Sequence, residues 1–496
     1  MWSLYSDLVL YAEKFIEEEL KIGYFHPDQI EQVTSSYIAE TDISKAHFNI
    51  ANSGFIYRDC FIIPNDNIDN NRKEHFVDYK ILILFQKNER DEEIIPCPCC
   101  RSFNVRGNSY PTIGVKSWEC HYPLCPDKSK YNRGKRYSLA SIIKQEAIED
   151  PLNEIDKENI SEWRLDMVSP KSLQEIIEYL IKQYSFCNDT VYLYNIPETR
   201  DEICFRKIKN KSFKPSSDID VESFYNSSFF QRFRIDKRVQ KQEKAINISP
   251  YNDIGIYNGD CESILQNFPS NYFDGAVTSP PYYNAKDYSQ WSNIYCYLYD
   301  MYNHAKEVFR TLKPGAYFIY NIFDYFDNEN NVVFSAMGKK RMILGAYIIH
   351  LFKHVGFEVQ QNIIWYKGNV QGHRSTNQGN NSPYYQAPIN CYEHVFCFKK
   401  PGDVVPNISF PTILKASPVI KMIKGKNTLG HSAPYPEDVP NLLIDRIYEG
   451  TILDPYAGSF TTARAAHNRC LRSVSIELSN EYCNLGLDLI KKHIKQ

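Results

Sequence analysis

Residues 278–282 read TSPPY and follow directly on an apolar stretch. Two consecutive prolines remove two backbone donors and hold the chain extended, so this segment can neither continue a strand nor start a helix. Such stiffness suits chemistry that needs hydrogen-bond acceptors in fixed positions, and the hydroxyl of Ser279 and the carbonyl of Pro280 are such acceptors. A plain stiff loop is the alternative that the segment leaves open by itself.

A second group of residues has the composition of a cofactor site. Residues 454–462 read DPYAGSFTT, a strand end followed by a turn of small residues and a helix start, and Glu477 closes the next predicted strand. Small residues let backbone amides approach a ligand, and a helix start favours negative charge. An acidic residue at the end of the following strand suits the hydroxyls of a ribose. Together these features predict a nucleoside-cofactor site, although the turn alone is too common to do so.

Cysteines gather between residues 97 and 125 with the spacing of metal ligands. Two pairs, of the forms CxxC and CxxxxC, lie a short way apart, which fits a closed tetrahedral zinc ribbon of structural type. The expected ligands are Cys97, Cys100, Cys120 and Cys125. Cys99 and His121 are spare candidates, and unligated reduced cysteines in loops are the alternative. Four cysteines gathered so closely favour zinc.

From residue 251 onward, segments with strand and helix patterns alternate. The predicted strands are 253–260, 273–281, 316–323, 358–367, 392–400, 451–458 and 473–478. The predicted helices are 261–268, 294–312, 341–357, 436–448, 461–468 and 480–493. Such alternation predicts a mainly parallel sheet with helices on both faces, and ligands of such sheets lie beyond the carboxyl ends of the strands. TSPPY, Asp454 and Glu477 all occupy such ends.

The length of 496 residues predicts more than one domain, with a division near residue 245. Residues 246–496 form the α/β domain. Residues 1–245 are irregular in pattern and are expected to be an α+β region that contains the zinc ribbon at 95–137 and a helix over 172–186. The basic run 206–244 is expected to be a solvated linker or helix face, with phosphate contact as the alternative.

Composition excludes several classes of protein. The net charge of −3 is nearly neutral, so contact with nucleic acid has to come from local patches. The first residues lack a basic segment and an uninterrupted apolar core, and no later stretch reaches the length of a membrane span. Fourteen cysteines without an export signal predict reduced thiols and a cytoplasmic protein with no membrane partner. Cys261, Cys296, Cys397 and Cys470 lie in apolar patterns and are expected to be packed in the core.

Several motifs agree, in order, with one family. Residues 251–496 resemble the DNA amino-methyltransferases, which move a methyl group from S-adenosyl-L-methionine to an exocyclic base nitrogen. TSPPY resembles their catalytic motif, LDPYAGSFTT their methionine-binding motif, HSAPYP (431–436) the stretch before it and IYNGDCESIL the segment near the adenine. The catalytic motif precedes the cofactor motif, which is the order of the beta group. The resemblance implies a Rossmann-like methyltransferase domain with permuted motif order.

The resemblance also implies roles for individual residues. Ser279 and Pro280 would accept the two N–H groups of the target amine, Pro281 would stiffen the motif and Tyr282 would stack on a base flipped out of the duplex. Contacts with S-adenosyl-L-methionine would come from Asp260, Ser432, Asp454, Tyr456, Ala457, Gly458, Ser459, Phe460, Thr461, Thr462 and Glu477. Phe460 departs from the family pattern, because the general motif has glycine there, and it hinders close backbone approach to the methionine moiety.

Within the family, serine at the first motif position correlates with methylation of cytosine N4, so we expect a site-specific cytosine-N4 DNA methyltransferase. Methylation of adenine N6 on the same fold is one alternative, and a non-catalytic zinc-containing DNA-binding protein with a degenerate methyltransferase domain is another. The expected partners are double-stranded DNA and a cognate restriction endonuclease or other defence-system protein. DNA recognition is expected in residues 1–245, with a separate nuclease or partner-docking module as the alternative. The polar loop 368–388 carries side chains of the kind that can read base edges or hold phosphate, with a flexible surface loop as the alternative.

Overall fold

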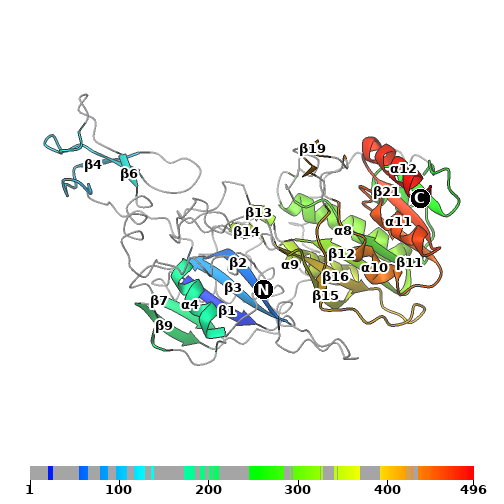
Figure 1. The fold of residues 1–496 in the computed structure, drawn as a ribbon, viewed down its shortest axis with the longest axis horizontal. Helices are drawn as coiled ribbons and strands as arrows, with labels where there is room; N and C mark the ends of the chain where they lie inside the picture. The colour runs from blue at the N-terminus through cyan, green and yellow to red at the C-terminus, as the bar shows by residue number, and fades with distance from the viewer. Residues whose placement is uncertain are drawn as a thin grey trace.

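The protein is described from a computed structural model (Figure 1). The structure describes residues 20–25, 55–64, 79–87, 97–108, 117–128, 136–138, 173–184, 190–194, 196, 200–203, 205–211, 245–283, 291, 294–323, 325–327, 340–342, 344–368, 391–419, 422–423, 426–427, 430 and 434–495.

An eight-stranded sheet is the centre of the C-terminal half. Its strands, in spatial order, are β10 (Ile254–Asn258), β21 (Arg472–Glu477), β20 (Thr451–Asp454), β11 (Phe273–Thr278), β12 (Leu312–Ile322), β16 (Tyr392–Lys399), β15 (Glu358–Tyr366) and β17 (Ile413–Lys415). All neighbours are parallel except β16, which runs antiparallel to both β12 and β15. The carboxyl ends of the other strands and the first residues of β16 therefore meet at one edge.

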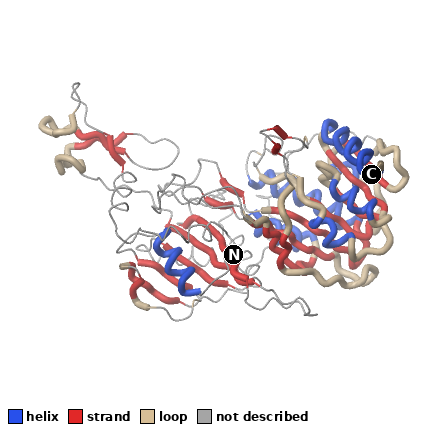
Figure 2. Tube along the Cα trace, viewed as in Figure 1, coloured by secondary structure: helices blue, strands red, loops and turns tan. Residues whose placement is uncertain are grey.

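Helices cover both faces of this sheet (Figures 1 and 2). One face carries α7 (Cys261–Leu265), α8 (Ile294–Thr311) and α9 (Leu344–Val355), and the other carries α10 (Asp438–Ile444), α11 (Thr461–Asn468) and α12 (Asn480–Ile494). In β12, Phe318 packs on Phe352 of α9, whereas Tyr317 points to the opposite cluster with Leu443 of α10. Burial on both faces explains why residues 316–320 of this strand are apolar in succession and do not alternate with polar residues.

The sequence predicted this succession of elements correctly. Each strand and helix predicted between residues 253 and 493 has a counterpart, and the sheet is mixed but mainly parallel, with helices on both faces. The predicted strand 273–281 ends at Thr278 because the prolines that follow cannot donate to a ladder. Cys470 was wrongly predicted to be buried, because it lies exposed in the turn after α11, whereas Cys261, Cys296 and Cys397 are buried.

The N-terminal half contains a six-stranded sheet and one packed helix. The strands, in spatial order, are β2 (Phe55–Pro64), β3 (Tyr79–Lys87), β1 (Leu20–Phe25), β7 (Thr190–Tyr194), β9 (Arg206–Lys211) and β8 (Glu202–Ile203). Helix α4 (Leu173–Tyr184) packs on this sheet through a stripe at helical spacing, as the pattern of 172–186 predicted. Tyr79 joins the two halves, since its hydroxyl donates to the carbonyl of Asn362 on β15 (2.7 Å).

The basic run 206–244 begins differently from the prediction. Residues 206–211 form β9, which pairs in parallel with β7 and antiparallel with β8, and Arg206 is only 1% exposed. This part is therefore an internal strand and not a linker or helix face, because pairing on both sides satisfies its backbone groups whatever its side-chain charge. Residues 212–244 lie outside the described residues.

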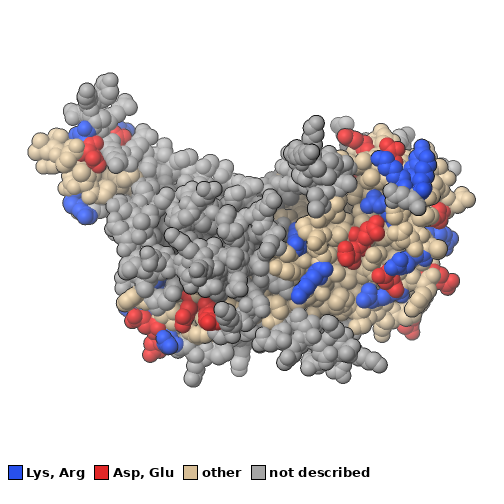
Figure 3. All heavy atoms as spheres, in the orientation of Figure 1, with Lys and Arg blue, Asp and Glu red and all other residues tan. Residues whose placement is uncertain are grey.

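Smaller elements complete the described chain. They are the three-stranded sheet of β4 (Val105–Asn108), β5 (Ser117–Cys120) and β6 (Arg136–Ser138), and the pairs β13 (Tyr325–Asp327) with β14 (Lys340–Met342) and β18 (Met422–Ile423) with β19 (Lys426–Asn427). Acidic and basic side chains are interspersed on the face of the C-terminal half shown in Figure 3. Among the described helices, none combines the length and apolar character that crossing a membrane requires.

Candidate active site

The TSPPY segment follows β11 at the shared edge of the sheet. Pro280 is buried, and Ser279, Pro281 and Tyr282 are half-buried. Because β11 lies beside β20, the fully buried Thr278 hydroxyl donates to a carboxylate oxygen of Asp454 at 2.7 Å, although the two residues are 176 positions apart. The fold thus brings the stiff proline segment and the turn of small residues together.

Asp454 has internal partners for both carboxylate oxygens. Oδ1 accepts from Thr278 and from the backbone N–H of Tyr456 (3.2 Å), and Oδ2 accepts from the hydroxyls of Thr462 (2.6 Å) and Tyr435 (3.0 Å). Burial raises the pKa of this carboxyl, and the hydrogen bonds oppose that shift. Asp454 therefore ties four segments together: the end of β11, the turn 455–460, the first turn of α11 and the 434–436 stretch.

Phe460 has the backbone conformation of a glycine and a fully buried ring. Its φ of 60° lies in the left-handed region, which L side chains adopt at a conformational cost. The ring packs in a cluster with Ile254 and Ile256 of β10 and Cys483 of α12. A Cβ atom at Gly486 of α12 would lie 2.0 Å from Cδ2 of this ring. The chain thus keeps the turn that a glycine would allow and places the phenyl group in the core.

We expect Gly486→Ala to lower the free energy of unfolding by about 1–3 kcal/mol, because the added methyl group overlaps the Phe460 ring. Urea denaturation measures the change, and Asn484→Ala on the exposed side of α12 is the matched control. In a Phe460→Ala background, the same Gly486→Ala change should have little effect. A loss of equal size in both backgrounds would show that the overlap is not the cause.

Glu477 closes β21 beside the turn. Its Oε2 accepts from the backbone N–H of Gly458 (2.9 Å) and its Oε1 from that of Ser479 (2.8 Å). Burial raises the pKa of this carboxyl against these bonds. The next residue, Leu478, is 72% exposed and was missed by the sequence analysis, because a single exposed leucine carries no pattern. An apolar surface beside a carboxylate suits a flat ring attached to a hydroxyl-bearing sugar.

Asp260 and Tyr456 are connected through a buried histidine. Asp260 caps α7 by accepting from the backbone N–H of Ser263 (3.2 Å), and its other oxygen lies 3.6 Å from Nε2 of His304 on α8. Nδ1 of His304 is hydrogen-bonded to the Tyr456 hydroxyl. Burial would lower the pKa of His304, but Cys261 and the Asp260 carboxylate raise it to about 10. His304 was not predicted from the sequence, because its position in a long amphipathic helix carries no functional signal.

The remaining predicted cofactor residues surround the start of α11. Ala457, Ser459, Thr461 and Thr462 are buried. Ser459 and Thr461 line a pocket together with Tyr435 and Arg464, and Arg464 donates to the carbonyl of Ser459 (2.8 Å). Ser432 and residues 369–388 of the polar loop lie outside the described residues.

Behind TSPPY lies a hydrogen-bonded network that the sequence analysis did not find. The Tyr282 hydroxyl donates to Oε2 of Glu393 (3.0 Å) and lies 3.1 Å from the Ser279 Oγ. The same Glu393 oxygen accepts from the amide of Asn321 (2.8 Å), and its other oxygen forms an ion pair with Lys367. Burial raises the pKa of Tyr282 well above its usual range. These residues come from the ends of four strands, β11, β12, β15 and β16, which only the sheet order brings together.

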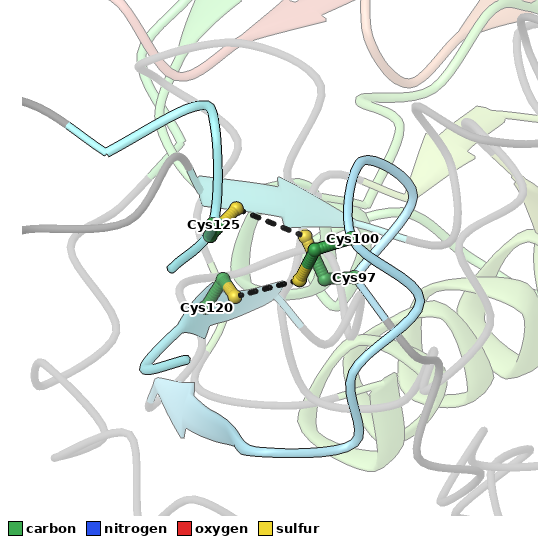
Figure 4. Close-up of side chains that lie close together, drawn as sticks. All are labelled: Cys97, Cys100, Cys120 and Cys125. Atoms are coloured by element: carbon green, nitrogen blue, oxygen red, sulfur yellow. Dashed lines mark hydrogen bonds between the residues drawn. The ribbon is translucent and has the colours of Figure 1, made fainter. Parts of the chain in front are cut away.

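The four predicted zinc ligands converge in the N-terminal half (Figure 4). The Sγ atoms of Cys97 and Cys125 are 3.9 Å apart, those of Cys100 and Cys120 are 3.6 Å apart, and all four lie within 4.8 Å of one another. Four sulfurs bound tetrahedrally to zinc at about 2.3 Å lie about 3.8 Å apart, so the set fits this metal. The spare candidate Cys99 is exposed and outside the cluster.

Comparison with known proteins identifies the family of the C-terminal half. Residues 273–488 match the N6/N4 methyltransferase model, described as DNA methylase. These residues belong to the N6/N4 DNA methylase family. The match begins at β11 and ends within α12, so it contains TSPPY, the turn 455–460 and Glu477.

Relatives of this family extend the similarity. The type II beta methyltransferase M.BslI of a Bacillus species is 36% identical over 98% of this chain, and the chain spans 62% of that relative's length. M.ScaI of Streptomyces caespitosus, a type II methyltransferase, is 28% identical over 53% of this chain and 90% of its own length. A DNA modification methylase structure from Thermus thermophilus, complexed with S-adenosyl-L-methionine, has a TM-score of 0.36 at 22% identity and covers 48% of this chain and 95% of its own.

Proposed function

We propose that this protein is a site-specific DNA methyltransferase that transfers a methyl group from S-adenosyl-L-methionine to N4 of cytosine. The observation that carries the proposal is the hydrogen bond between Thr278 and Asp454, which places TSPPY against the turn 455–460 across 176 positions. Membership of the N6/N4 DNA methylase family supports amino-methyl transfer. Serine at position 279 supports cytosine by family correlation.

The catalytic motif would activate a poor nucleophile. The lone pair of an exocyclic amine is delocalised into the base, and acceptors on its two N–H groups draw the nitrogen towards a tetrahedral geometry. Ser279 Oγ and the Pro280 carbonyl are the acceptors, and the prolines keep them aimed. The ring of Tyr282 would hold the flipped base, as enzymes acting on bases require. The sulfonium supplies the methyl group directly to nitrogen, so the protein needs no covalent nucleophile.

The cofactor would bind along the shared edge of the sheet. Glu477 would face the ribose hydroxyls, Leu478 the adenine ring and Asp260 the adenine amine, while the turn 455–460 would approach the methionine moiety. The positions of these residues at the ends of β10, β20 and β21 support the assignment. The internal contacts of Asp454 favour a role in holding this turn in place.

Incubation of DNA with the protein and S-adenosyl-L-methionine, followed by mass spectrometry of the nucleosides, tests the proposal. N4-methylcytosine is the expected product. N6-methyladenine would show that the target base is adenine and not cytosine. Cofactor binding without a methylated product would favour the non-catalytic alternative. Sequencing of the methylated bases would also give the recognition site.

Double-stranded DNA is the proposed partner, and residues 1–245 are proposed to contribute its recognition. The similarity to type II methyltransferases supports a place beside a cognate restriction endonuclease. Methylation would then protect the sites that the endonuclease cuts.

The four-cysteine cluster is proposed to hold a structural zinc ion. We expect about one zinc ion per chain by elemental mass spectrometry and its loss in Cys120→Ser, because three sulfurs no longer close the tetrahedron. Cys99→Ser is the matched control, since this exposed thiol lies outside the cluster and should leave the zinc content unchanged. Full zinc content in Cys120→Ser would contradict the assignment.

A further inference from the structure

The hydrogen bonds behind TSPPY have only one consistent direction. A carboxylate accepts and cannot donate, so the Tyr282 hydroxyl must donate its single proton to Glu393. The Tyr282 oxygen is then left to accept, and the Ser279 hydroxyl, 3.1 Å away, donates to it. The lone pairs of Ser279 Oγ therefore remain available for a substrate. An alternative acceptor for Tyr282, Oδ1 of Asn321, lies farther away at 3.5 Å and carries no charge.

Three donors surround the buried carboxylate of Glu393. Glu393 is 7% exposed, and its contacts are the Lys367 ammonium, the Asn321 amide and the Tyr282 hydroxyl. Each contact supplies a donor to a carboxylate oxygen, and a carboxylate only accepts. Glu393 stands at the start of β16, and because this strand runs opposite to its neighbours, the residue reaches the same edge as Ser279. The elevated pKa of Tyr282 keeps its hydroxyl protonated, which the chain of donors requires.

We propose that Glu393, acting through the Tyr282 hydroxyl, fixes Ser279 as an acceptor for the target amine and receives the proton that methyl transfer releases. Glu393 is thus a positioning residue that does not touch the substrate. The inference rests on the proposed amino-methyltransferase function. It depends on the hydroxyl of Tyr282, because an aromatic ring without one could not connect the serine with the carboxylate.

The proton balance of the step is closed within this network. The amine lone pair forms the new N–C bond, the S–C bond breaks and its electron pair stays on sulfur. The nitrogen then carries one proton too many, and it is strongly acidic because its lone pair no longer reaches the ring. That proton passes to Ser279 Oγ, the serine proton to Tyr282 and the tyrosine proton to Glu393. The carboxylate becomes a neutral acid, which later returns the proton to water.

Tyr282→Phe is the deciding variant, because it keeps the aromatic ring and removes the hydroxyl. We expect kcat to fall by about 10²-fold, within the range of general acid–base catalysis, with KM for DNA and cofactor affinity unchanged. Glu393→Gln is combined with Lys367→Gln, so that no buried charge is left unpaired. This pair should lose a similar factor, and the triple variant should lose no more than either alone, since all three changes interrupt one path.

Tyr317→Phe is the matched control, because its hydroxyl accepts from the backbone N–H of Ile408 in the cluster on the other face of the sheet. It should keep the wild-type kcat, and urea denaturation confirms that all variants fold. If the wild type transfers methyl groups and Tyr282→Phe does so at the same rate, this inference is overturned and the proposed methyltransferase function is not. A fall in kcat of about 10⁴-fold in the triple variant, the product of the losses in Tyr282→Phe and in the Glu393→Gln and Lys367→Gln pair, would also overturn it, since the residues would then act independently. A wild type that transfers no methyl group would overturn the proposed function and this inference with it.

Discussion

Ser279→Ala is expected to lower the rate of methyl transfer by on the order of 10²-fold while the affinity for S-adenosyl-L-methionine stays the same. Removing one preorganised hydrogen-bonding group from a catalytic site commonly has an effect of this size, and the Pro280 carbonyl remains to supply part of the activation. Single-turnover transfer from radiolabelled cofactor measures the rate, and calorimetry measures cofactor binding.

Ser270→Ala is the matched control for this change, because Ser270 is exposed in the loop before β11 and its hydroxyl accepts from Arg310, away from the TSPPY segment. It should transfer methyl groups at the wild-type rate. Product formation at full rate by Ser279→Ala would remove the serine from the mechanism. A parallel loss of cofactor affinity would instead indicate that Ser279 supports the fold of the site.

Asp454→Ala is expected to lower the free energy of unfolding by about 3 kcal/mol and to abolish cofactor binding. The change leaves the buried hydroxyls of Thr278, Thr462 and Tyr435 without their common acceptor, and each unsatisfied buried group costs about 1–3 kcal/mol before neighbours re-pair. Urea denaturation gives the stability, and calorimetry gives the binding.

Asp445→Ala provides the comparison for Asp454→Ala, because it removes an aspartate whose ion pair with Arg469 is solvent-exposed. Exposed pairs contribute about 0–1 kcal/mol, so this variant should unfold almost as the wild type does. Equal stability losses in the two variants would contradict the view that Asp454 holds the four segments together.

The sequence was sufficient for the succession of elements in residues 251–496. Long amphipathic stretches such as α8 and strands buried along most of their length, such as β12, carry patterns that depend on local sequence alone. Residues 206–211 were wrongly predicted to be a linker or helix face because of their basic charge. Pairing with neighbouring strands satisfies their backbone groups, so side-chain charge does not indicate whether such a segment forms a strand. The order of strands also escaped prediction, since hydrophobic patterns do not specify neighbours.

In the candidate site, too, the residues that lie in continuous motifs were predicted, and those that meet only through the order of strands were not. Ser279, Asp454 and Glu477 were found because each lies in a motif that is continuous in sequence. Glu393 and Lys367 were missed although both lie near the ends of predicted strands, because their meeting depends on the reversed direction of β16. A contact between strand ends is a property of sheet order, and a single sequence does not contain it.

The packing of Phe460 against Gly486 constrains how this chain could have changed over time. While the phenyl ring is present, a side chain at position 486 overlaps it and destabilises the fold, and loss of the ring would leave a cavity in the core that costs about 3–5 kcal/mol. A substitution at position 460 or at position 486 is therefore costly unless the other position changes too, although the first lies in the turn 455–460 and the second in α12. If an ancestor of this chain had glycine at position 460, a small residue had to be present at position 486 before phenylalanine could replace that glycine. Relatives with glycine at position 460 should therefore tolerate larger residues at position 486.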